Sequence, residues 1–232
     1  FGYGWRLGLS NLRVTSSGSQ GQGWEVTRAR FSYLLQPSRP HTITIVLPDG
    51  TTEEFDATTT PSATAFVPPQ TAVMSYRARP GTRGSLEPTG NRNVVVFNGS
   101  AQGAELVDDT TSRTWEPQGL RYTAADGTRF AIDADGTVRS IVDPKGNVVT
   151  ISRNGITHSA GSSVVFERDA FDRIVAIVDG AGNRQTYTYD AIGDLVAHTD
   201  AEGAITRFRY TGSHDIVEIV GAGGVGIRRL DY

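Results

Sequence analysis

Residues 187–208, with the sequence YTYDAIGDLVAHTDAEGAITRF, decide the fold because they contain one copy of a 21-residue unit and the first residue of the next copy. Three further copies align with this stretch and open at Phe130, Phe166 and Phe208. The copies are 21 residues apart, except that 36 residues separate the first two, which places an insertion of 15 residues around 154–165. Such a period indicates units that stack on their neighbours to bury a shared face. The repeat positions are Phe130, Asp133, Gly136, Asp143, Gly146, Phe166, Asp169, Asp179, Gly182, Tyr187, Tyr189, Asp190, Gly193, Asp200, Gly203, Phe208 and Tyr210.

Each copy contains two short apolar runs separated by two turn signals. The runs are rich in Tyr, Thr, Val and Ile, which fit a pleated sheet. Tyr187 and Tyr189 alternate with Thr186 and Thr188, so the two pairs point to opposite faces of a strand. Gly permits a positive φ and Asp bonds its own backbone, which is typical of tight turns. The sequence therefore predicts an all-β fold, a curved antiparallel sheet of stacked β-hairpin repeats.

The motif Tyr189-Asp190-x-x-Gly193-x-Leu195, followed by Asp200-x-x-Gly203 and Tyr210, resembles the tyrosine-aspartate (YD) repeat of RHS proteins. That family includes bacterial RHS polymorphic toxins, shell-forming components of toxin complexes, and teneurins. The resemblance covers roughly residues 120–232, and the opening segment 1–7 is similar to a lead-in of such repeats. The fourth copy departs from the pattern at Thr211, His214 and Gly221, so we expect its turns to differ or to mark a boundary.

The resemblance implies a structural role in a hollow shell that encloses, presents or delivers an attached polypeptide such as a toxin. The implied partners are the rest of the parent polypeptide and an enclosed or attached C-terminal segment, in a bacterial protein that is secreted or at the cell surface. It implies neither a cofactor nor an enzymatic activity. Because the chain begins at Phe1 directly inside a motif, we expect it to be a piece of a longer protein.

Composition narrows the class of protein further. The 232 residues include 27 Gly and are 38% hydrophobic, as expected for turn-rich β structure. A net charge of −3 without a basic cluster argues against a nucleic-acid partner. The absence of cysteine excludes disulfides and thiol metal ligands. The sequence contains neither a signal peptide nor an apolar run long enough to span a membrane.

The two halves of the chain differ in regularity. Residues 1–118 lack the period, and we expect them to form an irregular β lead-in with strands at 24–35, 42–47, 52–55 and 94–97. Residues 57–92, rich in Thr, Pro, Gly and Arg, predict a long loop. Residues 119–232 are predicted to hold the repeats, with Asn154-Gly155 turning an extra hairpin inside the insertion.

Several motifs suggest chemistry when they are considered alone. Residues 221–226 match the dinucleotide pattern GxGxxG, and Asp133 and Asp135 match part of a calcium loop. The register explains the glycines as turn positions, and Ala131 and Val142 occupy the first and last ligand positions of a calcium loop. Residues 143–146 (DPKG) resemble the end of RHS cores in toxin families, but they align with the turn at 179–182. We therefore predict no catalytic, cofactor or metal site.

The aromatic residues leave one alternative open. Trp5, Trp24 and Trp115, with the repeat tyrosines, could form a sugar-binding surface, which would make the chain an adhesin or a carbohydrate-binding module. The other interpretation is that aromatic residues in alternating register line a core. His198 occupies a column that is Ile in the other copies, and we expect a half-buried residue there rather than a ligand.

Overall fold

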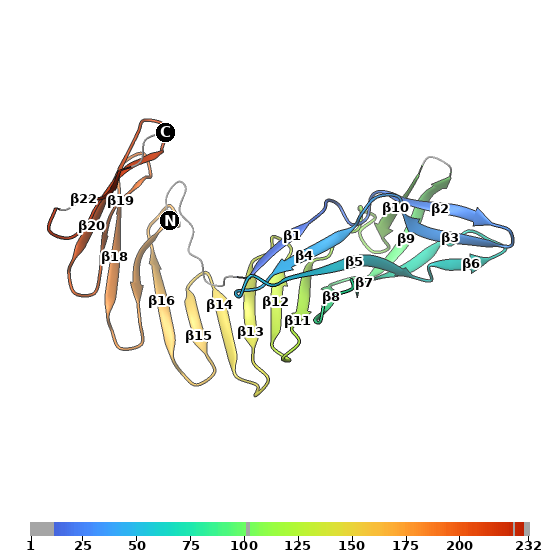
Figure 1. Cartoon of the computed structure of the whole chain (residues 1–232), viewed down its shortest axis with the longest axis horizontal. Coiled ribbons are helices and arrows are strands. Elements are labelled where there is room, and N and C mark those ends of the chain that lie inside the picture. Colours follow the sequence, from blue (N-terminus) through green and yellow to red (C-terminus); the bar gives the residue numbers. More distant parts are fainter. Residues whose placement is uncertain (1–11, 101–102, 225, 230–232) are drawn as a thin grey trace. The chain divides into compact units, whose positions relative to one another are not determined.

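The computed structural model describes residues 12–100, 103–224 and 226–229, and all regular elements within these ranges are β-strands (Figure 1). The chain divides into two compact units, one of Ser10–Val148 and one that includes Val149–Tyr232. The boundary expected from the sequence, between residues 118 and 119, lies inside the first of these units. Over the described residues, no helix of the length and apolarity needed to cross a bilayer is found.

A nine-stranded antiparallel sheet forms most of unit Ser10–Val148. Its order is β1-β4-β5-β7-β9-β10-β2-β3-β6. Trp24, Met74, Leu106 and Trp115 are buried together at its centre. The strands are β1 (Arg13–Ser16), β2 (Trp24–Ala29), β3 (Ser32–Pro37), β4 (Thr42–Val46), β5 (Thr52–Thr60), β6 (Ala63–Ala65), β7 (Thr71–Ala78), β9 (Asn93–Ser100) and β10 (Gly103–Asp108).

The long loop expected at residues 57–92 is wrong. This stretch contains the end of β5, all of β6 and β7, and a further strand, β8 (Ser85–Thr89). The prolines that suggested a loop are compatible with strands because of where they fall. Pro61, Pro68, Pro69 and Pro80 lie between strands, and Pro88 lies in β8, which is at the edge of its sheet. An edge strand tolerates proline because one of its sides makes no ladder hydrogen bonds.

Three more strands of this unit belong to the sheet that has β8 at its edge. They are β11 (Gly119–Thr123), β12 (Arg129–Asp133) and β13 (Val138–Val142), and they pair in the order β8-β11-β12-β13. The buried carboxylate of Glu53 on β5 connects them to the first sheet, because it accepts a 2.7 Å hydrogen bond from the Tyr122 hydroxyl. Desolvation of Tyr122, followed by its hydrogen bond to Glu53, raises the pKa of that phenol.

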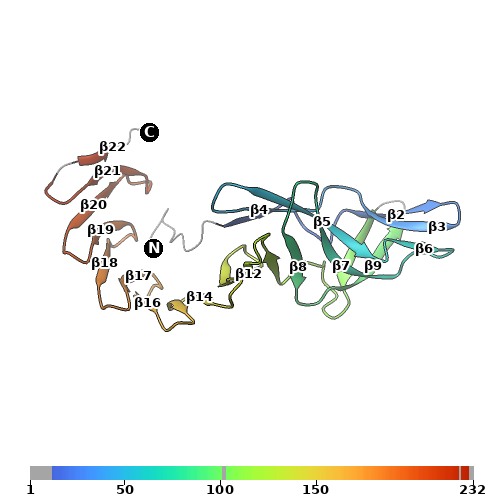
Figure 2. The ribbon, with the colours of Figure 1, turned by 60° about the horizontal axis from the view of Figure 1, so that its bottom comes forward.

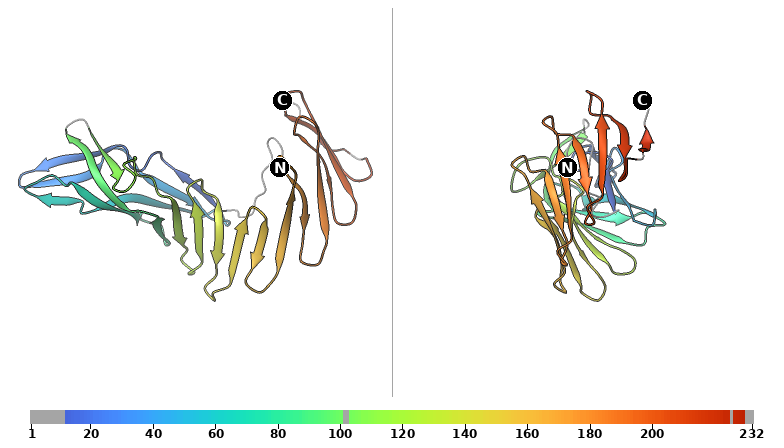
Figure 3. Two further views of the ribbon diagram at one scale, coloured as in Figure 1. Left: turned by 180° about the vertical axis from the view of Figure 1, so that it is seen from behind. Right: turned by 90° about the vertical axis from the view of Figure 1, so that its left-hand side faces the viewer.

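The repeats of the second unit add antiparallel strands strictly in chain order, which Figure 3 shows from behind as the orange to red strands. Seen in Figure 2, the succession from β14 to β22 bends into an arc. The predicted insertion supplies one extra hairpin, in which Ser152 faces Gly155. The strands are β14 (Val148–Ser152), β15 (Gly155–His158), β16 (Ser163–Arg168), β17 (Ile174–Val178), β18 (Arg184–Tyr189), β19 (Leu195–Thr199), β20 (Ile205–Tyr210), β21 (Ile216–Val220) and β22 (Gly226–Arg229).

Candidate functional site: the repeated turns and the aromatic face

One turn geometry recurs along the chain. In a five-residue turn the first amide donates to the fifth carbonyl at 2.8 to 3.0 Å, and the fourth amide donates to the first carbonyl at 2.9 to 3.3 Å. The fourth residue always has a positive φ, between 65° and 99°. This combination is the three-residue hairpin loop with a left-handed bulge residue, which favours Gly at the fourth position. The turns occupy 47–51, 124–128, 133–137, 143–147, 158–162, 169–173, 179–183, 190–194, 200–204 and 211–215.

The repeat aspartates hold these turns closed. In each of five turns, one carboxylate oxygen of the first residue accepts hydrogen bonds from the third and fifth amides, at 2.7 to 3.1 Å. The Asn183 side chain, then its amide, hold the pKa of Asp179 below its usual value. Asn147 does the same for Asp143. The five carboxylates are those of Asp143, Asp169, Asp179, Asp190 and Asp200.

The first repeat closes its turn differently. The Asp133 carboxylate pairs with Arg139 at 2.5 Å, and Asp135, the third residue of the turn, accepts from the Thr137 amide at 2.9 Å. Asp49 and Asp126 use this same arrangement, each accepting from the fifth amide of its turn at 2.8 Å. An Asp-Gly-Thr tripeptide accompanies it each time, at 49–51, 126–128 and 135–137. Sequence reasoning missed the turn at 124–128, which this tripeptide could have identified.

The fourth copy keeps the turn geometry at 211–215, which corrects the expectation of a different turn there. The Thr211 hydroxyl replaces the carboxylate and accepts from the Ser213 and Asp215 amides at 3.1 and 3.2 Å. His214 adopts φ of 67° and places its Nδ1 2.9 Å from Oδ1 of Asp194, in the corresponding turn of the preceding repeat. Asp194 is fully buried, and its Oδ2 has no hydrogen-bond partner among the described residues.

Two sequence columns of the repeat face each other across neighbouring strands. The opening aromatic column is directly opposite the mostly Ile column: Phe130 pairs with Ile141, Phe166 with Ile177, Tyr187 with His198, and Phe208 with Ile219. The His198 ring therefore replaces isoleucine and stacks on Tyr187, with ring centres 5.1 Å apart. Its Nε2 lies 3.0 Å from the Gln185 side-chain oxygen, which fits a half-buried residue rather than a ligand.

The second unit has two faces of different character. Directly opposite residues of a sheet share a face, so the pairing defines both. We call one the aromatic face; it comprises Phe166, Ile177, Gln185, Tyr187, His198, Thr206, Phe208 and Ile219. The other is the charged face, on which Arg184 reaches across β17 to Glu167 at 2.5 Å and Arg209 pairs with Glu218 at 2.9 Å. On the aromatic face Phe166 is buried, Gln185 is exposed, and the other residues are half-buried.

A β-bulge recurs once in every repeat, immediately before the column that contains Tyr189 and Tyr210. Bulges increase the right-handed twist of a sheet, so their repetition bends the ladder regularly. The Tyr189 hydroxyl donates to the Ile174 carbonyl at 2.7 Å, and the Tyr210 hydroxyl donates to the Leu195 carbonyl at 2.9 Å. Burial raises the pKa of Tyr189 to about 12.

The motifs that suggested other chemistry fall on structural positions. Residues 221–224 turn from β21 into β22, with Gly224 at φ of 77°, and a strand follows instead of a helix. Trp24 and Trp115 are each 1% exposed, and their ring N–H groups donate to the Gln20 and Asn91 carbonyls, so neither presents a face to a sugar. Trp5 lies outside the described residues. Among the residues described, no three His, Asp or Glu side chains cluster as metal ligands would.

Comparison with known proteins gives one family match and one structural likeness to report. Residues 189–225, in the third and fourth copies of the unit, match the family model of the RHS Repeat. A chain from the Tc holotoxin pore of Photorhabdus luminescens is similar over 92% of this chain, with 10% sequence identity and a TM-score of 0.26. This chain covers 16% of that one. No curated protein matches the sequence.

Proposed function

Because this chain is an RHS-repeat protein, also called a YD-repeat protein, we propose that it forms part of a wall that encloses, presents or delivers an attached polypeptide. The observation that carries the proposal is the aromatic face of the second unit. A sheet with one apolar and one charged face is stable when a further layer covers the apolar one. In an enclosing wall, that layer is the enclosed polypeptide or another part of the same shell.

The residues of the two faces support a proposal of which face lies inside the wall and which lies outside. Ile177, Tyr187, Phe208 and Ile219 are half-buried and lie in one row across β17 to β21. A row of apolar side chains that remains partly exposed is typical of an interaction surface in soluble proteins. Glu167 and Arg184 on the opposite face form ion pairs that suit a hydrated surface. We therefore assign the aromatic face to the interior of the wall.

The ladder itself supports further repeats as partners. Each hairpin pairs with the one before it, and β22 pairs with β21 on one side only among the described strands. An edge of this kind is a template for another strand. The partners we propose are therefore the rest of the parent polypeptide and a segment attached to it. We propose that the parent protein acts outside the bacterial cell or at its surface, and that the wall performs no catalysis.

Protease protection of the attached polypeptide tests this function in the intact parent protein. We expect slow cleavage of the attached segment in the wild type and in Thr188→Asp, which places a charge on the charged face. Ile177→Asp places the same charge on the aromatic face and should make cleavage fast. Circular dichroism of each variant verifies that the sheet is still formed. Equal, rapid cleavage of the attached segment in all three proteins would contradict the proposal.

A further inference from the structure

A slot of about 730 Å³ opens in unit Ser10–Val148, and none of the residues that line it is a repeat position. It is lined by the end of β3, at 35–37, by the second half of β5, at 57–59, and by the connection 38–41. Trp24 and His41 stack beneath it, with ring centres 5.0 Å apart and planes 6° from parallel. Its volume is within the range of about 300 to 1,000 Å³ that is usual for ligand pockets.

Two buried side chains that line the slot have polar atoms without a partner. His41 is 3% exposed and Thr59 is 6% exposed, yet neither His41 Nδ1 nor Thr59 Oγ1 makes a hydrogen bond within the described chain. A buried polar atom without a hydrogen-bond partner destabilises the folded chain, so such atoms are rare without a reason. Two of them lining the same slot indicate that it is built to receive a polar ligand.

The tautomer of His41 defines what that ligand must offer. His41 Nε2 lies 2.5 Å from the Gln22 carbonyl oxygen, which can only accept a hydrogen bond. Nε2 therefore carries the proton, and in the neutral ring Nδ1 is left as an acceptor. Burial lowers the pKa of His41, which favours this neutral ring. A ligand must accordingly donate an N–H or O–H to Nδ1.

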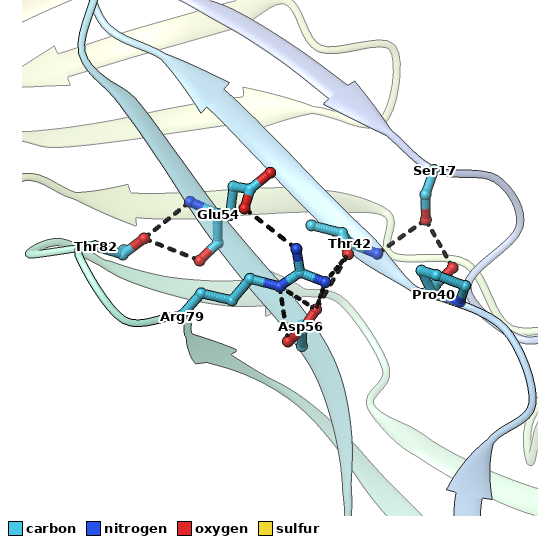
Figure 4. Close-up of polar contacts among 7 residues, drawn as sticks. All are labelled: Ser17, Pro40, Thr42, Glu54, Asp56, Arg79 and Thr82. Atoms are coloured by element: carbon cyan, nitrogen blue, oxygen red, sulfur yellow. Dashed lines mark hydrogen bonds and ion pairs between the residues drawn. The ribbon is translucent and has the colours of Figure 1, made fainter.

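The rim of the slot is positively charged. Figure 4 shows Arg79, whose guanidinium is already held by Asp56 at 2.8 to 2.9 Å, by Glu54 at 3.2 Å and by the Thr42 hydroxyl at 3.0 Å. Arg79 therefore neutralises Asp56. The exposed Arg77 and Arg39 also line the slot, and the one polar contact that either makes with described residues is from Arg39 to the Gln22 carbonyl at 3.4 Å. The positive charges of Arg77 and Arg39 are therefore available to pair with an anionic ligand.

The walls of the slot are strand edges where pairing stops. β3 pairs with β6 only over residues 32–34, although it continues to Pro37. β5 pairs with β4 only over residues 52–56, although it continues to Thr60. Backbone hydrogen bonds from Leu35 to Ser62 and from Ala57 to His41 end the two ladders. Strand edges of this kind bind an extended peptide by adding it as a strand.

We propose that this slot binds an acidic peptide segment in extended conformation. A peptide N–H donates to Nδ1 of His41, the Thr59 hydroxyl hydrogen-bonds the peptide, and a carboxylate pairs with Arg77 and Arg39 at the rim. An extended backbone supplies both the donor and the carbonyl acceptors that two open strand edges require. This binding is separate from the wall function proposed for the repeats of Val149–Tyr232, because all residues that line the slot belong to unit Ser10–Val148.

Fluorescence anisotropy with the full chain and a labelled synthetic peptide tests the proposal. The probe is an eight-residue peptide of alternating valine and threonine that ends in two aspartates and a free carboxylate. The comparison peptide ends in two lysines and an amide. Arg77→Glu reverses a rim charge, and Thr59→Val removes the unpartnered hydroxyl with little change of shape. The matched control is Arg92→Glu, an exposed arginine of the same unit that does not line the slot.

We expect the acidic peptide to bind about tenfold more tightly than the lysine peptide, and Arg77→Glu to weaken it by about tenfold. Arg92→Glu should bind as the wild type does. Thr59→Val should bind more weakly while its melting temperature stays equal or rises, because an unsatisfied hydroxyl has been removed. Equal binding of both peptides, absence of binding, the same loss in Arg92→Glu, or displacement of the peptide by an uncharged hexasaccharide would overturn the proposal.

Discussion

The Tyr210 hydroxyl donates a 2.9 Å hydrogen bond to the backbone carbonyl of Leu195, the first residue of the neighbouring strand β19. One repeat earlier, Tyr189 makes the same bond to Ile174, the first residue of β17, at 2.7 Å. In both cases the donor follows the bulge that bends the strand. The tyrosine of the motif therefore ties the third and the fourth repeat each to the one before it, at the point where the sheet turns.

Replacing these tyrosines with phenylalanine tests that tie. Tyr189→Phe and Tyr210→Phe keep the ring and remove the donor, so we expect each to lower the free energy of unfolding by about 1 kcal/mol. Chemical denaturation monitored by circular dichroism measures the change. Tyr33→Phe, outside the repeats, is the control and should change stability little. Equal effects at all three positions would contradict a specific role for the repeat tyrosines.

The turn glycines should differ sharply from a glycine beside them. Gly182 has φ of 88°, so Gly182→Ala forces a side chain into the left-handed region and should destabilise the protein by about 1 kcal/mol. Gly180 lies in the same turn without a positive φ, and a Cβ there would meet nothing closer than 3.5 Å. Gly180→Ala should therefore leave the urea midpoint unchanged or raise it slightly. A larger loss in Gly180→Ala than in Gly182→Ala would contradict the turn geometry.

Acid should weaken the repeats through the turn carboxylates. The pKa of Asp179 is lowered in the folded chain, so its stabilising effect is present above the unfolded pKa of about 3.9 and disappears as pH falls through the folded value. Asp179→Asn should lower stability at neutral pH and flatten the dependence of the urea midpoint on pH below about 5. Asn183→Ala removes the carboxylate's main donor and should have a similar, smaller effect. An unchanged pH profile in both variants would refute this explanation.

The contact between successive turns should give Asp194 and His214 a coupling energy in the free energy of unfolding. His214→Ala removes the partner of the buried Asp194 oxygen and should cost about 1 to 3 kcal/mol. Once Asp194 is replaced by Asn, the same His214→Ala change should cost less, because the carboxylate is gone. A double-mutant cycle measures this difference, and Ser213→Ala in the same turn serves as a neutral control. Strict additivity would contradict the contact.

The period of the repeats could be predicted because the turn positions are chemically demanding. Asp at the first position and Gly at the fourth occur together in five turns, at 133–137, 143–147, 179–183, 190–194 and 200–204, and the column directly opposite each aromatic is mostly Ile. Even the fourth copy obeys this geometry, since a Thr hydroxyl can accept the same amides as a carboxylate. Asp172 and His214 occupy the positive-φ position at a higher energetic cost than Gly would. Each of these two side chains makes a contact with a preceding turn or hairpin.

The rest of the fold depends on where each strand lies in its sheet, which the amino-acid composition of a segment does not show. Residues 57–92 were expected to be a loop because Pro and Gly interrupt them, but whether a proline breaks a strand depends on which edge of the sheet the strand occupies. The slot between β3 and β5 depends on where pairing ends, which involves residues far apart in the sequence. Trp24 and Trp115 could not be assigned to a core or a surface until their neighbours were known.

The most direct test of the wall is the chemical accessibility of its two faces in the intact parent protein. The chain itself contains no cysteine, so reactivity beyond that of the unsubstituted parent protein reports the new residue: Thr206→Cys on the aromatic face of β20 or Thr188→Cys on the charged face of β18. Modification by a maleimide on a bulky polymer should be about tenfold slower at position 206 than at 188, and equal once the protein is unfolded. Equally fast modification at both positions in the folded protein would contradict an aromatic face that lies inside a wall.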